Sequence, residues 1–334
     1  MKKIIALMLV LSLAFCFVAC KKDDKKDETP AEKNYQLAIG VALTQEVKDG
    51  KLTGNISNTV AAIIIDADNK IVACRIDTLA IDELEIENGI VAAKTYQTKA
   101  EKGSAYGMLT NSDYYGSKLA EWDTQAKAFE TFVTGKTQAE VNGIAVDADG
   151  KTTNTDLKAG CTIAITDFIK AVDNAFKSTK KVAFKTADAL TLGVSATGTV
   201  ANEEDNQDNP IPNNFSYTVD FAATAFAGGK VVAAIIDSNV ATTTIEGTEF
   251  TAVEYPGTKL EQGDAYGMLT NSDYYGSKFA EWYTQAQNYA NLANGKTAEE
   301  LAGLSTDKTE LTGICTMYAG GYKAALQKAA TYTR

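Results

Sequence analysis

A stretch of fourteen residues occurs twice in this chain, 160 positions apart. The sequence AYGMLTNSDYYGSK fills positions 105–118 and again positions 265–278. With two exceptions the identity continues to positions 126 and 286, so both tryptophans of the chain, Trp122 and Trp282, lie at equivalent places. Repetition on this scale is the signature of a duplicated structural unit. The chain is therefore predicted to contain two units that fold alike.

Each half opens with segments typical of β-strands. Apolar segments at Leu37–Ala42 and Leu190–Ser195 precede β-branched runs that flank turn residues, which predicts hairpins. The hairpin strands are 59–66 and 71–77 in the first half, and 216–226 and 231–237 in the second. The run Val60–Ile65 lacks polar alternation, so we expect a strand that is covered on both faces. Further strands are predicted at Ile90–Tyr96 and Glu249–Tyr255.

Each half continues with helical patterns. After each copy of the repeated stretch, apolar residues recur three and four positions apart, as Leu119, Trp122, Ala126, Phe129 and Val133 do in the first half. Gly135 and Gly295 are predicted to end these helices. Thr137 with Glu140, and Thr297 with Glu300, are typical of capping boxes that begin a second short helix. A last helix is expected around Ile165–Phe176 and at the matching place in the second half, where Tyr318 and Tyr322 lie.

Strands followed by helices, twice over, predict an α+β fold. We expect two tandem homologous domains, each a small antiparallel sheet followed by packed helices. Residues 34–180 form the first repeat domain and residues 181–334 the second, with the boundary near 178–188. The acidic, proline-containing segment 202–214 is expected to be an exposed loop of the second repeat.

The N-terminus is typical of a lipoprotein leader. Lys2 and Lys3 precede the apolar run Ile4–Val18, which is short for a membrane span. Residues 1–19 are predicted to be a signal peptide, Cys20 the lipidated residue, and residues 20–33 a charged tether. An ordinary secretory signal is the alternative. The expected location is the extracytoplasmic face of the cell membrane, with the lipid anchor at Cys20.

Charge and composition exclude several classes of function. The formal charge of −11 falls to −13 once the leader with its two lysines is removed, so nucleic acid is not an expected partner. The chain contains no histidine, which excludes catalytic sites built on that residue. No metal or obligatory cofactor is predicted, because the acidic segment 202–214 lacks the ligand spacing of a calcium loop. Cys161 and Cys315, at matching places in the two halves, are expected to be small buried residues rather than reactive thiols.

The duplicated loop is the candidate site. Tyrosine rings can stack on a planar ligand or a sugar, and the polar residues around them can donate and accept hydrogen bonds. In the first copy the candidate ligand-binding residues are Tyr106, Asn111, Asp113, Tyr114, Tyr115, Ser117, Lys118 and Trp122. In the second copy they are Tyr266, Asn271, Asp273, Tyr274, Tyr275, Ser277, Lys278 and Trp282. The alternative is a structural loop whose aromatic residues fill the core.

Two acidic residues of the loop suggest narrower functions. Asp113, or alternatively Ser117, is a candidate cap for the helix that follows, whose free amides would suit an anion. Asp113 with Glu121 is also a candidate carboxylate pair for glycoside hydrolysis. Caps and solvated helix faces are the more common roles of such residues, so we do not expect an enzyme.

The loop and the helix after it carry a resemblance. The matching residues are Ala105–Met108, Gly116–Lys118, Glu121-Trp122, Gln125-Ala126 and Gly135–Thr137, with their copies in the second half. They resemble surface lipoproteins and FMN-binding-domain proteins of anaerobic Gram-positive bacteria, some of which are linked with extracellular electron transfer. The resemblance implies a flavin site. The segment that carries covalent flavin in such proteins has at most a degraded counterpart at Asp49–Ser57, so any FMN would be bound non-covalently.

Three functional hypotheses follow from these features. The first is a non-enzymatic, lipid-anchored surface protein with two duplicated ligand-binding modules, whose small-molecule or cell-surface ligand the sequence does not name. The second is an electron-transfer component that holds FMN non-covalently. The third, disfavoured by the missing histidines, is an enzyme that acts on cell-wall glycans.

Overall fold

The computed structural model describes residues 31–48, 51–82, 86–87, 90–92, 94–204, 210–246, 249–251 and 255–334. The predicted leader, Cys20 and most of the tether lie outside these residues. Residues 32–334 form one compact unit. Within the described ranges, no helix has both the length and the apolar character needed to cross a membrane.

The first repeat builds an antiparallel group of long strands. β1 (Lys33–Lys48), β2 (Lys51–Ile65) and β3 (Ile71–Ile81) pair in sequence order. The predicted hairpin is confirmed, with Ile65 opposite Ile71 and Asn69 in the left-handed conformation at φ 55°. β7 (Val182–Thr186), from the expected boundary, adds to the free edge of β1.

The second repeat builds a matching group. β8 (Leu190–Glu204), β9 (Pro210–Ala227) and β10 (Lys230–Glu246) are again antiparallel, and Gly228 and Gly229 form the predicted turn. The expected loop 202–214 is mostly strand, because β8 and β9 pair as far as Glu204 and Pro210. Residues 205–209 of that segment lie outside the described ranges.

Each repeat also gives a short strand to the other. β6 (Lys94–Tyr96) of the first repeat pairs with β8, and β11 (Glu249–Thr251) of the second pairs with both β10 and β2. The strand order is β6-β8-β9-β10-β11-β2-β1-β7, with β3 on β2, and β4 (Ile86–Glu87) pairs separately with β5 (Ile90–Val91). The strand predicted at Ile90–Tyr96 is therefore two short strands. Whether either repeat folds alone stays a prediction.

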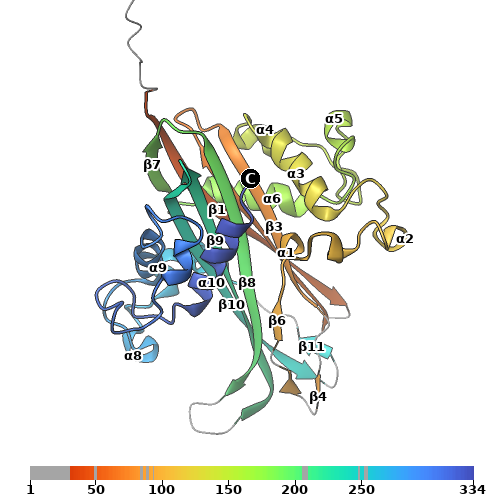
Figure 1. The fold of residues 1–334 in the computed structure, drawn as a ribbon. Helices are drawn as coiled ribbons and strands as arrows, with labels where there is room; N and C mark the ends of the chain where they lie inside the picture. The colour runs from red at the N-terminus through yellow and green to blue at the C-terminus, as the bar shows by residue number, and fades with distance from the viewer. Residues whose placement is uncertain are drawn as a thin grey trace, which may run out of the picture. The chain divides into compact units, whose positions relative to one another are not determined.

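The helices follow the strands in both repeats, which confirms the α+β prediction (Figure 1). In the first repeat they are α1 (Lys99–Lys102), the 3₁₀ turn η1 (Gly103–Tyr106), α2 (Ser112–Tyr115), α3 (Trp122–Val133), α4 (Gln138–Asn142), α5 (Thr155–Lys158) and α6 (Thr166–Lys177). In the second they are α7 (Lys259–Gln262), η2 (Gly263–Tyr266), α8 (Ser272–Tyr275), α9 (Trp282–Asn291), η3 (Glu300–Gly303) and α10 (Gly320–Thr331).

The caps agree with the sequence in part. Gly135 follows α3 in the left-handed conformation, and Thr137 forms the predicted capping box with Glu140. The cap predicted from Asp113 or Ser117 is wrong. Asp113 lies inside α2, and α3 begins only at Trp122, because left-handed Gly116 ends the short helix and the chain runs on without helical structure before α3.

The strand faces explain how the layers pack. Leu37, Ile39 and Val41 of β1 enter the core shared by the two strand groups, whereas Ala38 and Ala42 face the core under the first repeat's helices. α6 packs on β1 and β2, and α10 packs on β8 and β9. The two strand groups therefore face each other, and each is covered on its outer face by its own helices (Figure 1). The whole run Val60–Ile65 is buried, as predicted.

Cys161 and Cys315 are buried as expected from the sequence, and Cys74 is buried as well. Cys74, Cys161 and Cys315 are buried and free. Burial raises the pKa of Cys161 to about 11 and raises the pKa of the other two thiols. Thiols in this state are poor nucleophiles, which fits a packing role.

Candidate functional site

The duplicated loop is fixed to α3 by a glutamate at the start of that helix. Glu121 accepts hydrogen bonds from the backbone N–H of Met108 at 2.9 Å and of Leu109 at 3.1 Å. Glu281 does the same for Met268 and Leu269 in the second copy. Both oxygens of each carboxylate are used in this way. Glu121 therefore has a structural task, which weakens its candidacy as half of a glycosidase pair.

A buried glutamine on α3 holds the far end of the loop. Gln125 Nε2 donates to Ser117 Oγ at 2.9 Å and to the Ala120 carbonyl at 2.7 Å, and its Oε1 accepts from Thr162 N–H at 2.8 Å. Gln285 repeats these contacts with Ser277, Ala280 and Thr316. The two serines proposed as ligand contacts are thus buried members of this framework.

We expect the Gln125→Leu variant to loosen the loop. Leucine fills a similar volume but leaves the Ala120 carbonyl and the Thr162 N–H unpaired, at a cost of about 2 kcal/mol in unfolding free energy. Hydrogen exchange should accelerate at residues 108–120 of the first copy, while residues 268–280 act as the internal control. Equal protection of the two copies would contradict this role.

The loop tyrosines form a cluster at the surface. The Tyr106 and Tyr115 rings lie 5.2 Å apart, and Tyr114 meets Tyr115 edge-on at 5.0 Å. Tyr266, Tyr274 and Tyr275 repeat this arrangement at 5.2 and 5.0 Å. Tyr114 is 85% exposed, whereas Tyr106 and Tyr115 are half-buried. Burial and the neighbouring Tyr115 raise the pKa of Tyr106.

A cavity of about 610 Å³ lies between this cluster and the strands of the first repeat. The loop side supplies Ala105, Tyr106, Tyr114 and Tyr115. The strand side and α1 supply Thr44, Ile56, Ser57, Ala80, Asp82, Gln97, Lys99 and Lys102. The structure therefore brings the three predicted tyrosines together around one space, and adds two lysines that the sequence did not single out.

Lys99 lies at the wall of this cavity against two aromatic rings. Its ammonium is 5.2 Å from the centre of the Tyr106 ring and 5.5 Å from that of Trp122. Burial lowers its pKa to about 8, and the charges of Asp77 and Asp167 act against that fall. A signal for this residue exists in the sequence, since the pattern Thr-Lys-x-Glu-x-Gly precedes both copies of the loop at 98–103 and 258–263.

A buried aspartate joins α1 to β3. Asp77 accepts hydrogen bonds from the N–H groups of Thr78 at 2.8 Å and Ala100 at 3.1 Å. Asp237 accepts equivalent bonds from Ser238 and Leu260. Burial raises the pKa of Asp77 to about 6 and that of Asp237 to about 7, while these hydrogen bonds act in the opposite direction. The two aspartates fix the first turns of α1 and α7, which carry the lysines.

These two carboxyls predict a pH dependence of stability. A raised pKa means that the folded protein binds the proton more tightly than the unfolded chain, so the contribution is greatest in acid and is lost as pH rises through 6 and 7. Between pH 5 and pH 7.5 each carboxyl should lower the unfolding free energy by about 1–3 kcal/mol. Urea titrations at both pH values should show a flatter dependence in the Asp77→Asn/Asp237→Asn variant. An unchanged slope would contradict the assignment.

The other predicted residues of the first copy do not line this cavity, and their counterparts in the second copy make the same contacts. Asn111 and Asn271 donate to the carbonyls of Gly107 and Gly267, which closes the turn. Exposed ion pairs join Asp113 to Lys118 at 3.1 Å and Asp273 to Lys278 at 3.5 Å. Trp122 and Trp282 are buried in the core. The loop thus combines both alternatives, since some of its residues fill the core and others line the cavity.

Searches with the whole chain found no matching family model, no matching curated protein and no matching solved structure. Among the described residues there is also no group of three metal-ligating side chains. The site must therefore be interpreted from its own chemistry.

Proposed function

We propose that this protein is a lipid-anchored, extracytoplasmic binding protein with two duplicated ligand-binding modules. The modules are the loops Tyr106–Lys118 and Tyr266–Lys278, and binding involves no chemical conversion of the ligand. The observation that carries the proposal is the cavity of about 610 Å³ between the first loop and its sheet. Its volume lies in the range of small-molecule sites, about 300–1,000 Å³.

The wall of the cavity supports a ligand with a flat face. Tyr106, Tyr114 and Tyr115 supply aromatic rings, and Thr44, Ser57 and Gln97 supply hydroxyl and amide groups. Aromatic rings with a few placed polar groups are typical of sites that bind small organic molecules. Glu121 and Gln125 fix the loop to α3 by hydrogen bonds, so little ordering cost would accompany binding.

The anchor is part of the proposal. Cys20, followed by a charged tether, would hold the binding unit 32–334 close to the membrane without a spanning segment. A mass spectrum of the protein from membranes should show a lipidated Cys20 as its first residue. An unmodified N-terminus at another position would leave a secreted binding protein.

Non-covalent FMN is the second candidate ligand. The aromatic wall suits a planar isoalloxazine ring, and Ser57, Gln97 and Lys99 of the lining could bond to the ring's polar atoms. If bound, FMN would supply one- and two-electron redox chemistry, and the protein would serve in electron transfer. The role of this chain's residues would be to stack on the ring and to orient it by hydrogen bonds.

The test uses residues 21–334 purified without the leader. FMN fluorescence and absorbance are recorded during titration of the parent protein and of the Tyr115→Ala/Tyr275→Ala variant. Quenching that saturates in the parent and is at least 10-fold weaker in the variant would support the site. Tyr318→Ala is the matched control, because Tyr318 is 77% exposed and lies outside both loops. A parent protein that does not respond to FMN rejects the flavin candidate.

A further inference from the structure

Both repeats place a lysine beneath the duplicated loop in the same way. Lys259 lies 5.2 Å from the centre of the Tyr266 ring and 5.3 Å from that of Trp282, which nearly reproduces the geometry of Lys99. Each lysine also has an aspartate near it on the second strand of the hairpin, Asp77 on β3 or Asp237 on β10. Two of the acidic neighbours are thus equivalent in sequence and in structure.

A second acidic neighbour of the lysine differs between the repeats. In the first repeat it is Asp167, in the first turn of α6, whose carboxylate accepts a hydrogen bond from Thr44 at 2.9 Å. Thr162 and Thr316 are equivalent, because they donate to the equivalent glutamines Gln125 and Gln285. Counted from these threonines, the position of α10 that matches Asp167 of α6 is Gly321. The helix of the second repeat therefore provides no carboxylate there.

The strand of the second repeat provides it instead. Asp220 on β9 is a neighbour of Lys259, and a methyl group built on Gly321 would overlap its Oδ2 atom. Asp220 pairs across the ladder with Ser238, and the equivalent pair in the first repeat is Thr59 with Thr78. The acidic group is therefore on a helix in the first repeat and on a strand in the second, and the Asp220 carboxylate fills the space next to the helix position that is equivalent to Asp167.

This exchange differs from what the chain does with another buried ion pair. Arg75 and Glu130 of the first repeat are bonded at 3.1 Å and buried. Their equivalents in the second repeat are the apolar residues Ile235 and Ala290. A buried ion pair that serves packing alone is often replaced by apolar residues without loss of stability. The lysine beneath the loop has kept two acidic neighbours in both repeats, which points to a use for its charge.

We propose that Lys99 and Lys259 are the ligand-binding cations of the two loops, and that Asp167 and Asp220 are equivalent groups that hold them. The proposal rests on the proposed binding function and names the atoms that carry it. It also implies that the second repeat keeps a working site, although its surroundings differ, with Gln262 in place of Lys102.

The charges around Lys99 define the class of ligand. Asp77, Asp82 and Asp167 act on Lys99 together with Lys102, so the site has no excess of positive charge. An anion would gain little there, whereas an ammonium N–H directed at an uncharged oxygen would form a charge-assisted hydrogen bond. The ligand class is therefore a neutral ring compound with carbonyl or hydroxyl oxygens, either a heterocycle or a sugar.

The first experiment needs no ligand and tests whether Asp167 and Asp220 act in the same way on their lysines. Lysines are reductively methylated with ¹³C, the Lys99 signal is assigned from the Lys99→Arg variant, and its pKa is followed by NMR. Asp167→Gly should lower this pKa by about one unit, because a nearby negative charge is lost. Thr59→Asp/Asp167→Gly, which copies the second repeat, should restore at least half of the shift. No effect of Asp167→Gly, or no restoration, overturns the equivalence.

The second experiment tests the role of the lysine in binding. Riboflavin and chitobiose are titrated as a neutral heterocycle and a neutral sugar, with FMN as the charged counterpart of riboflavin. Lys99→Met/Lys259→Met should weaken binding of the neutral probe by about 10-fold or more, in line with the loss of a charge-assisted hydrogen bond. Lys127→Met on the exposed face of α3 is the control.

The outcomes separate this inference from the proposed function. If a probe binds the parent and the lysine variant equally well, the lysine assignment fails while the binding function stands. If FMN binds much better than riboflavin, the neutral ligand class is overturned. If no probe binds, the ligand class and the assignment both fail. If the Tyr115→Ala/Tyr275→Ala variant binds as the parent does, the proposed site itself is wrong.

Discussion

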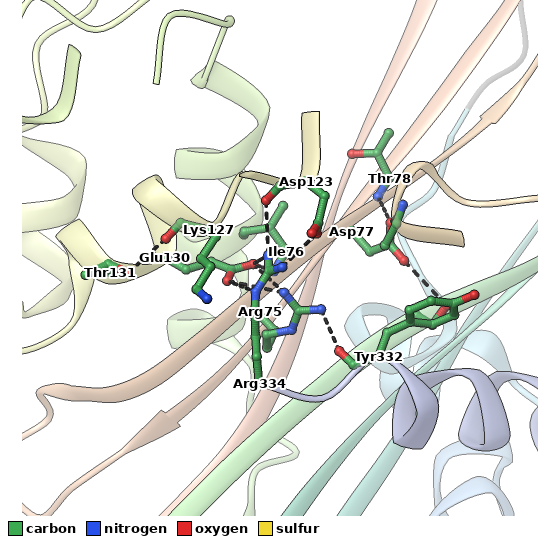
Figure 2. A network of polar contacts seen from close by, with 12 residues as sticks. Arg75, Ile76, Asp77, Thr78, Asp123, Lys127, Glu130, Thr131, Tyr332 and Arg334 are labelled. Atoms are coloured by element: carbon green, nitrogen blue, oxygen red, sulfur yellow. Dashed lines mark hydrogen bonds and ion pairs between the residues drawn. The ribbon is translucent and has the colours of Figure 1, made fainter. Parts of the chain in front are cut away.

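Replacement of Glu130 by alanine is expected to lower the free energy of unfolding by about 3–5 kcal/mol. The Glu130 carboxylate is bonded to Arg75 Nη1 at 3.1 Å and to Arg334 Nε at 2.8 Å, and it accepts the Ile76 N–H at 2.8 Å (Figure 2). Its side chain is 5% exposed. Removal of this carboxylate leaves two guanidinium groups close together with far less compensation, so the loss exceeds that of an ordinary side-chain contact.

The control for this variant is another acidic group of the same network. Asp123 bonds Arg334 at 2.7 Å but is 38% exposed, so Asp123→Ala should cost only about 1 kcal/mol. The triple variant Arg75→Ile/Glu130→Ala/Arg334→Leu replaces the charges with apolar groups, as at Ile235 and Ala290 in the second repeat, and should recover much of the loss. Urea titrations measure the free energy of unfolding of all three variants, and the comparison requires that their m-values equal that of the parent protein. A Glu130→Ala loss below 1 kcal/mol would contradict this account.

The same network explains one of the two differences between residues 105–126 and their copy at 265–286, the one at Asp123. Arg334 pairs through its backbone with Leu192 of β8, and its side chain reaches across to Asp123 of the first repeat (Figure 2). The equivalent of Asp123 is Tyr283, which instead donates to Asp264 at 2.9 Å and lies under the Lys180 ammonium. Asp123 and Tyr283 thus each make contacts that the equivalent residue of the other copy does not make. The other difference, Leu119 against Phe279, lies on exposed surface.

Local sequence patterns predicted most strands and helices of this fold, but they did not predict which strands pair between the two repeats. The hairpin turns, the apolar run of β2 and the cap at Thr137 depend on neighbouring residues, so the sequence contained the information. The pairing of β6 with β8 and of β11 with β2 depends on how one repeat faces the other. These strands are three residues long, too short for a periodic pattern to assign a partner. The prediction of an exposed loop at 202–214 was wrong for a similar reason, because β8 and β9 pair with each other into this segment.

The candidate site was predicted in part. The duplicated tyrosines were expected to stand at a ligand site, and Tyr106, Tyr114 and Tyr115 do line one cavity. Ser117 was selected for its hydroxyl, but that hydroxyl is bound to Gln125, and a sequence does not show which polar group another residue will satisfy. Lys99 has a signal only in the pattern Thr-Lys-x-Glu-x-Gly before both copies of the loop, and that pattern does not show that the lysine is buried. Its burial follows only from the packing of α1 against β3.

The second large effect is expected at a pair of glycines. Gly40 on β1 and Gly193 on β8 occupy equivalent places in the two repeats. A methyl group on Gly40 would overlap the backbone of Ala175 and Ala171 on α6, and one on Gly193 would overlap the Ala329 carbonyl on α10. Backbone atoms cannot rotate away as a side chain can, so the helix must move off its sheet. Gly40→Ala and Gly193→Ala should each cost about 3 kcal/mol or more in unfolding free energy.

Gly303→Ala is the control for both glycine variants, because a methyl group there meets nothing within 4 Å and should change stability by less than about 0.5 kcal/mol. The Gly40 variant also tests how the fold supports the site. α6 carries Asp167, so a helix displaced from β1 should weaken the Asp167–Thr44 contact and lower the pKa of Lys99, whereas Gly193→Ala should leave the pKa of Lys99 unchanged. Close approach of α6 to β1 is then the feature that places the Asp167 carboxylate near Lys99 in the first repeat. A Gly40→Ala protein as stable as Gly303→Ala would show that α6 adjusts freely, and this link between packing and the site would be wrong.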